Sequence, residues 1–98
     1  EKLLAITKEA SQAALDKNIE LATAKYEELK TTWDEQEDIL IVFVRHEHVD
    51  QISVGVAKLS SILTGDNLSE FISECSVIEE AAEHMWRSEL PMSIEFFS

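Results

Sequence analysis

Apolar residues recur every three or four positions along most of this 98-residue chain. This is the spacing of one face of an α-helix. The first such stripe runs through residues 3–15, where small Ala side chains form a shallow face that permits close packing. Asp16 and Asn18 follow it and offer turn and cap chemistry. The pattern therefore predicts a first helix near residues 2–15 and a second that begins at residue 18.

The second stripe also keeps helical spacing, and it comprises Ala22, Tyr26, Leu29, Trp33, Leu40, Phe43 and Glu47. Thr31 and Thr32 could mark a kink or a new start in it, since Thr32 and Glu35 have the spacing of a capping box. Lys, Glu and Gln surround the two threonines and are good helix formers. We therefore expect one long helix over residues 18–47.

Residues 39–44, Ile-Leu-Ile-Val-Phe-Val, form the longest apolar run. Their β-branched content is typical of a strand, whereas the charged flanks on both sides, Asp-Glu-Gln-Glu-Asp and Arg-His-Glu-His, are not turn sequences and favour a helix. A helix that is apolar on all sides is one that is buried on all sides. We therefore expect this run to form the centre of the core. It overlaps a later, rotated stripe that comprises Val42, Arg45, Val49, Ile52, Val56, Leu59 and Leu63.

A single helix over residues 18–63 would be about 69 Å long at about 1.5 Å per residue, which is too long for a compact domain of this size. We expect a break near His46–Asp50, with Asp50 as the N-cap of a third helix over residues 50–64. Gly65 would end that helix.

A fourth helix is predicted over residues 67–87, with Asp66 or Asn67 as its cap, and Asn67 and Glu70 have capping-box spacing. Pro91 would end helical structure, and Leu90–Ser98 forms an apolar tail that we expect to pack on the bundle or on a partner. The buried stripe of the fourth helix comprises Leu68, Phe71, Ile72, Cys75, Ile78, Ala82 and Met85. Residues 1–98 are therefore predicted to form a single all-α domain, an antiparallel four-helix bundle. The composition agrees, because two Gly and one Pro are too few for the turns of a sheet protein.

Charge narrows the range of partners. The formal net charge is −12, and residues 31–98 contain three basic residues against fourteen acidic ones. Such a surface repels phosphate groups, so we expect no nucleic acid as partner and no direct binding to anionic lipid. A basic partner or a cation remains compatible with the charge. No apolar run approaches the roughly 18 residues of a membrane-spanning helix.

The sequence contains no arrangement of residues that is typical of an enzyme. The acidic side chains alternate with the apolar stripes, which places most of them on solvated faces. Cys75 falls on an apolar face, and Gly55 and Gly65 are too few for a phosphate-binding loop. Trp33, Tyr26 and Trp86 could line a ligand groove, but their helical spacing favours a place in the core or at its edge. We therefore expect no enzyme and no cofactor.

One cluster, at residues 45–50, could hold a site. His46 and Asp50 are four residues apart, which is a workable spacing for two ligands of a divalent metal on a helix. His84, four residues after Glu80, could supply a third ligand from the last helix. The alternative is that His46 and Asp50 bond each other or cap a helix junction, and this spacing alone favours that structural role.

The same cluster carries a resemblance to a known family. Trp33, then His46-Glu47-His48-Val49-Asp50-Gln51-Ile52, then spaced leucines and a short apolar tail resemble a family of uncharacterised proteins of clostridia-like Gram-positive bacteria. This family is classed as a domain of unknown function, and its motif reads His-x-Glu-Ile-Asp-x-Ile after a Trp. The chain departs from the motif at His48, where the family usually has Glu, and at Val49, where it has Ile.

The resemblance implies an N-terminal membrane anchor ahead of this domain and a location outside the cytoplasm. The first residue is Glu1 and the first Met is Met85, so we expect a segment upstream that would carry the anchor. The resemblance implies no reaction. We expect a non-enzymatic interaction or structural module that binds a protein partner or a second copy of itself. The alternative is a metal- or cation-binding domain that uses His46, Asp50 and His84.

Overall fold

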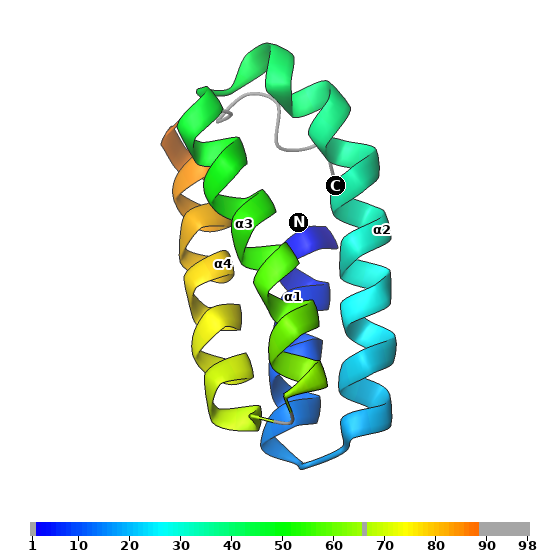
Figure 1. The fold of residues 1–98 in the computed structure, drawn as a ribbon. Coiled ribbons are helices and arrows are strands. Elements are labelled where there is room, and N and C mark those ends of the chain that lie inside the picture. The colour runs from blue at the N-terminus through cyan, green and yellow to red at the C-terminus, as the bar shows by residue number, and fades with distance from the viewer. Residues whose placement is uncertain (1, 66, 89–98) are drawn as a thin grey trace.

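The computed structural model describes residues 2–65 and 67–88, and these form four helices packed side by side (Figure 1). The helices are α1 (Lys2–Leu15), α2 (Ile19–Phe43), α3 (His46–Thr64) and α4 (Leu68–Ser88). Each helix packs on the one that follows it, and α4 closes the ring by packing on α1. The predicted antiparallel four-helix bundle is confirmed.

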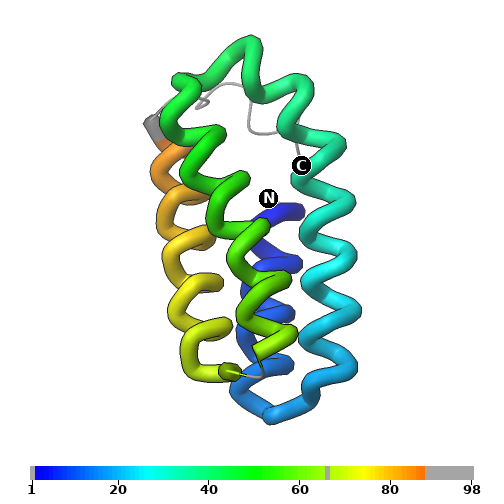
Figure 2. The backbone as a smooth tube through the Cα atoms, in the orientation of Figure 1, coloured from blue at the N-terminus to red at the C-terminus, as the bar shows by residue number. Residues whose placement is uncertain are grey.

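The backbone tube in Figure 2 shows how the connections divide between the two ends of the bundle. The α1–α2 and α3–α4 turns lie at one end, and the α2–α3 connection lies at the other. The chain therefore runs up and down with short links, as expected for antiparallel neighbours.

The predicted caps account for three of the helix ends. The side-chain oxygen of Asn18 accepts a hydrogen bond from the Leu21 amide at 3.1 Å, and that of Asn67 accepts one from the Glu70 amide at 3.1 Å. Each bond satisfies an amide that has no partner within its own helix. Gly65 ends α3 as expected, since its amide bonds the Ser61 carbonyl at 3.0 Å.

The core is built from both tryptophans and from the stripes read in the sequence. Trp33 and Trp86 are each 2% exposed, Tyr26 is 6% exposed, and Cys75 is fully buried. The alanines of α1 let its backbone lie close to α2 and α4. The other fully buried large side chains include Leu3, Leu29, Leu40, Ile52, Leu59, Phe71, Ile78 and Met85.

The break between the second and third helices is not where the sequence placed it. α2 continues through Thr31 and Thr32 as predicted, but it ends at Phe43 and not at residue 47. Val44 is extended, with φ −122° and ψ 150°, and turns its side chain inward to 7% exposure. α3 then begins at His46, so the N-cap position belongs to Arg45 and not to Asp50. A β-branched residue adopts the extended link readily, whereas the polar cluster after it is helical.

The prediction that residues 39–44 form the centre of the core is wrong. Leu40 and Val44 are buried, but Ile39, Ile41, Val42 and Phe43 are 41%, 50%, 74% and 63% exposed. We call these four exposed side chains the apolar corner. Part of this exposure follows from helix length, because α2 has 25 residues and α1 only 14, so the end of α2 extends beyond α1 (Figure 1). The predicted apolar tail, Leu90–Ser98, lies outside the described residues.

Candidate functional site

His46 and Asp50, the predicted pair, bond each other at the start of α3. The His46 Nε2 atom lies 3.3 Å from the Asp50 Oδ2 atom, and the two side chains are 73% and 57% exposed. An exposed pair of this kind contributes between about 0 and 1 kcal/mol to stability. The contact joins two successive turns of one helix, which is the structural role that the sequence favoured.

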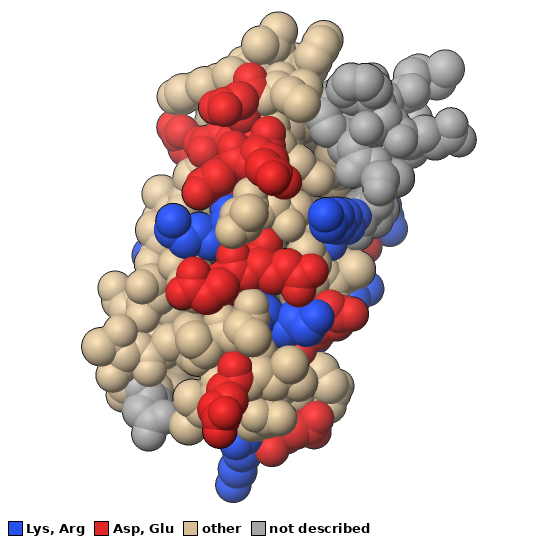
Figure 3. Space-filling model, turned by 90° about the vertical axis from the view of Figure 1, so that its right-hand side faces the viewer, with Lys and Arg blue, Asp and Glu red and all other residues tan. Residues whose placement is uncertain are grey.

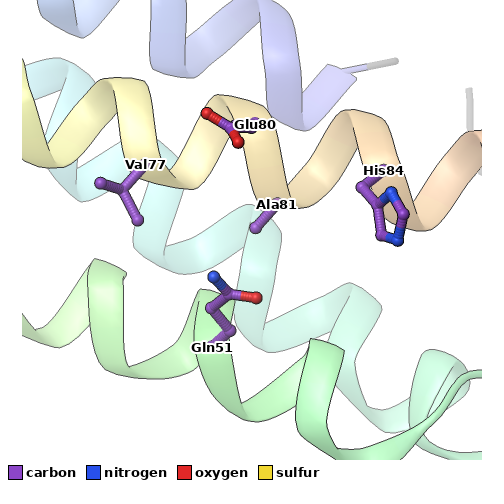
Figure 4. A pocket seen from close by; sticks show the side chains of 5 residues that line it. All are labelled: Gln51, Val77, Glu80, Ala81 and His84. Carbon is purple, nitrogen blue, oxygen red and sulfur yellow. The ribbon is translucent and has the colours of Figure 1, made fainter.

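The third predicted ligand, His84, lies apart from that pair on α4. It lines a cavity of about 330 Å³ between α3 and α4, together with Gln51, Val77, Glu80 and Ala81 (Figure 4). Gln51 reaches from α3 toward α4, while Glu80 and His84 project from successive turns of α4.

His84 has an imidazole neighbour, but this neighbour is His48 rather than His46. The two ring centroids are 5.2 Å apart and the ring planes meet at 83°. Within residues 2–65 and 67–88, no group of three or more His, Cys, Asp or Glu side chains could hold a metal ion. The geometry therefore gives no support to the metal-binding alternative.

Trp33 of α2 is joined to α3 by a short chain of hydrogen bonds. The Trp33 Nε1 atom donates to the Ser53 hydroxyl at 2.9 Å, and that hydroxyl donates to the Glu37 carboxylate at 2.8 Å. Ile52, next to Ser53, is fully buried. Trp33 and Ile52 therefore serve the α2–α3 contact.

Ser53 and Glu37 were missed in the sequence. The sequence offered one weak signal for Glu37, which is four residues after Trp33 and so shares its face of the helix. Nothing in the sequence placed Ser53 opposite the indole, because this contact spans twenty residues.

Two groups of α4 have a shifted pKa. Burial raises the pKa of the Cys75 thiol from its ordinary 9.0 to about 12, and Glu79 and Glu74 add repulsion. Burial also raises the pKa of Glu79, with Glu83 adding to the shift and Lys8 of α1 opposing it. Cys75 is fully buried, so its thiol packs as a small hydrophobic group, and its raised pKa disfavours the thiolate form.

Cys75 gives a prediction about reactivity. A pKa of about 12 in place of 9.0 lowers the thiolate fraction at pH 8 by roughly a thousandfold. We expect Ellman's reagent to label the folded protein only at the rate of unfolding, and to label it at once in urea. The control is the C75A/S76C variant, because Ser76 is exposed on the same helix. Rapid labelling of folded Cys75 would contradict its buried position.

The pKa of Cys75 also predicts a loss of stability in alkali. The unfolded chain loses the thiol proton near pH 9, whereas the folded chain keeps it up to about pH 12. The unfolded state therefore binds fewer protons between these values, and the free energy of unfolding falls as pH rises through this window.

Acidic side chains gather on α2 next to the apolar corner. Figure 3 shows several groups of Asp and Glu along this face, and the uppermost group lies below a region that shows neither acidic nor basic residues. Asp34, Glu35 and Asp38 are the exposed acids of this stretch, and they directly precede Ile39. The corner is thus an apolar surface with an acidic border.

Residues 1–93 match the domain of unknown function DUF4363. The chain belongs to the DUF4363 family. This match covers every described residue, and it confirms the predicted resemblance to an uncharacterised family.

Two further comparisons of this DUF4363 domain were negative. A search of curated proteins and a search of solved structures each found no match. No helix in the described part of the chain is both long and apolar enough to cross a membrane.

Proposed function

We propose that this DUF4363 domain is a non-enzymatic helical interaction module that binds a protein partner through the apolar corner. The observation that carries the proposal is the exposure of Ile39, Ile41, Val42 and Phe43, four large apolar side chains within five residues. Single exposed apolar residues are normal on a soluble surface, whereas a contiguous group of them is typical of a binding site.

The acidic border favours a particular kind of partner. Asp34, Glu35 and Asp38 repel phosphate groups and anionic headgroups, so a nucleic acid or an anionic bilayer is a poor fit. A second copy of this chain would bring the same acids together. A protein surface with an apolar centre and Lys or Arg around it matches both properties of the corner.

The proposal also includes a location outside the cytoplasm, with the domain held at the membrane by an upstream segment. Its support is the family resemblance of the Trp33 and His46–Ile52 motif. The test is a fusion of alkaline phosphatase to the C-terminus of the full-length protein, because this enzyme is active only outside the cytoplasm. Inactive fusions with normal expression would contradict the location.

The binding proposal is tested by photo-crosslinking in cells that express the full-length protein. Benzoylphenylalanine at position 42 is expected to give a discrete crosslinked product with a protein. The matched control is position 54, because Val54 is an exposed valine on α3, at 53% exposure against 74% for Val42. Val42→Asp should abolish binding and leave the helical circular dichroism unchanged. Equal crosslinking at both positions, or none at either, would contradict the proposal.

A further inference from the structure

A cavity of about 160 Å³ lies between α2 and α3, and we call it the α2–α3 cavity. No side chain of the apolar corner lines it, so it is separate from the surface that the proposed function uses. Its wall combines aromatic rings, a carboxylate and a hydroxyl with small apolar groups. α2 contributes Tyr26, Trp33 and Glu37 to this wall, and α3 contributes Ser53, Val56 and Ala57.

Glu37 brings a negative charge to the α2–α3 cavity. Its carboxylate accepts a hydrogen bond from the Ser53 hydroxyl at 2.8 Å, and that hydroxyl accepts one from the Trp33 indole N–H at 2.9 Å. The Glu37 side chain is half-buried, and within residues 2–65 and 67–88 it takes part in no salt bridge. Because removing a carboxylate from water is costly unless its charge is compensated, a cation in this cavity is favoured.

The lysine of the same wall is engaged elsewhere. Lys30 lines the cavity, but its Nζ atom lies 3.7 Å from the Oδ2 atom of Asp34, which also lines it. The two residues are one turn apart on α2, and their side chains are 53% and 61% exposed. Lys30 and Asp34 therefore balance each other, and the charge of Glu37 is left over.

The remaining groups of the wall select among cations. Tyr26 and Trp33 are seven residues apart on α2, which is about two turns, and both line the cavity. Aromatic rings attract cations, and together with a carboxylate they suit a cation that carries methyl groups. A primary ammonium group would need acceptors for three N–H groups. A metal ion would need several ligands, whereas Glu37 is the single carboxylate of this wall that forms no salt bridge within the described residues.

We propose that the α2–α3 cavity binds a quaternary ammonium group. Tyr26 and Trp33 contact its methyl groups, and the Glu37 carboxylate, held in place by Ser53, compensates its charge. The net charge of −12 also favours the approach of a cation. A free choline-like solute and the choline headgroup of a zwitterionic lipid share this chemistry.

A titration with choline, followed by nuclear magnetic resonance, tests the proposal. Choline is expected to shift the indole signal of Trp33 and the amide signal of Ala57 in a saturable way, and to leave the amide signal of Val77 on α4 unchanged. The compound 3,3-dimethylbutan-1-ol has the shape of choline without its charge, so it should cause no saturable shift.

Two variants that lose the same charge separate a local role of Glu37 from the field of the whole protein. Glu37→Gln keeps the size of the side chain and is expected to weaken choline binding by about tenfold or more. Glu27→Gln is the matched control, because Glu27 is an exposed acid of α2 that does not line the cavity, and it should leave the affinity unchanged. The proposal is overturned if choline gives no saturable shift, if the neutral analogue binds as well, or if both variants bind equally.

Cosedimentation with phosphatidylcholine vesicles distinguishes the two sources of the ligand. Cosedimentation that free choline and Glu37→Gln each abolish would support the site and assign a lipid headgroup. Choline binding without cosedimentation would support the site and assign a free solute. Val42→Asp in the apolar corner should bind choline normally, so this proposal and the proposed function can fail independently.

Discussion

Replacing Trp33 with Ala is expected to lower the free energy of unfolding by about 3–5 kcal/mol, close to the whole stability of many small domains. Trp33 is 2% exposed and packs between α2 and α3, so truncation leaves a large cavity that the helices can close only in part. The variant also removes the donor that holds the Ser53 hydroxyl. Urea unfolding followed by circular dichroism at 222 nm measures the loss.

Two milder variants separate packing from hydrogen bonding at this site. Trp33→Phe keeps most of the buried area but loses the indole N–H, and Ser53→Ala removes the acceptor, so each should cost about 1–3 kcal/mol. Because both act on one bond, the double variant should cost less than their sum. Two outcomes would contradict the importance of the Trp33 packing and its bond to Ser53. One is a double variant whose loss of stability equals the sum of the two single losses, and the other is a loss below about 1 kcal/mol for Trp33→Ala.

The fold was readable from the sequence because its main determinants are local. Helical spacing identified four helices, and Asn18 and Asn67 marked the starts of two of them through side chains that act within three residues. The buried stripe of α4, from Phe71 to Met85, follows from spacing alone. These features depend only on residues three or four positions apart, which is why the sequence predicts them.

The apolar run shows where local information stops. Whether Ile39–Val44 is enclosed depends on how far the neighbouring helices extend, and this is a property of α1 and not of the run. The rule that an all-round apolar helix is buried assumes neighbours on every side. In this bundle α1 is 11 residues shorter than α2, so the rule fails at the end of α2.

The contacts of the candidate site also differ in how far the sequence predicts them. The His46–Asp50 contact lies within one helix, and its spacing in the sequence was sufficient to predict it. The His48–His84 pair and the Trp33–Ser53–Glu37 chain each join two helices, and their register depends on how those helices pack. The spacing of residues within one helix does not predict how that helix is aligned against its neighbour.

Gly55 of α3 faces Ile78 of α4 at close range, and replacing it with Ala is expected to destabilise the protein. A Cβ atom at this position would lie 2.7 Å from the Ile78 Cγ1 atom and 3.3 Å from the Glu74 carboxylate. Ile78 is fully buried and has little room to move. Gly→Ala inside a helix is ordinarily worth about 0.5–1 kcal/mol of stability. Here the clash outweighs that gain, and a net loss of about 1–2 kcal/mol is expected.

Ile78→Ala is a severe change in itself, but in that background Gly55→Ala is expected to affect stability in the opposite direction. With the isoleucine side chain removed, Gly55→Ala no longer meets Cγ1 and should stabilise that background by about 0.5–1 kcal/mol. Gly65→Ala is the matched control, because its nearest neighbours are backbone oxygens at 3.6 and 3.7 Å and its φ is −81°. It should leave stability unchanged or slightly raised. If Gly55→Ala is neutral in the native background, or equally destabilising with Ala at position 78, then the contact between α3 and α4 is looser than the structure shows.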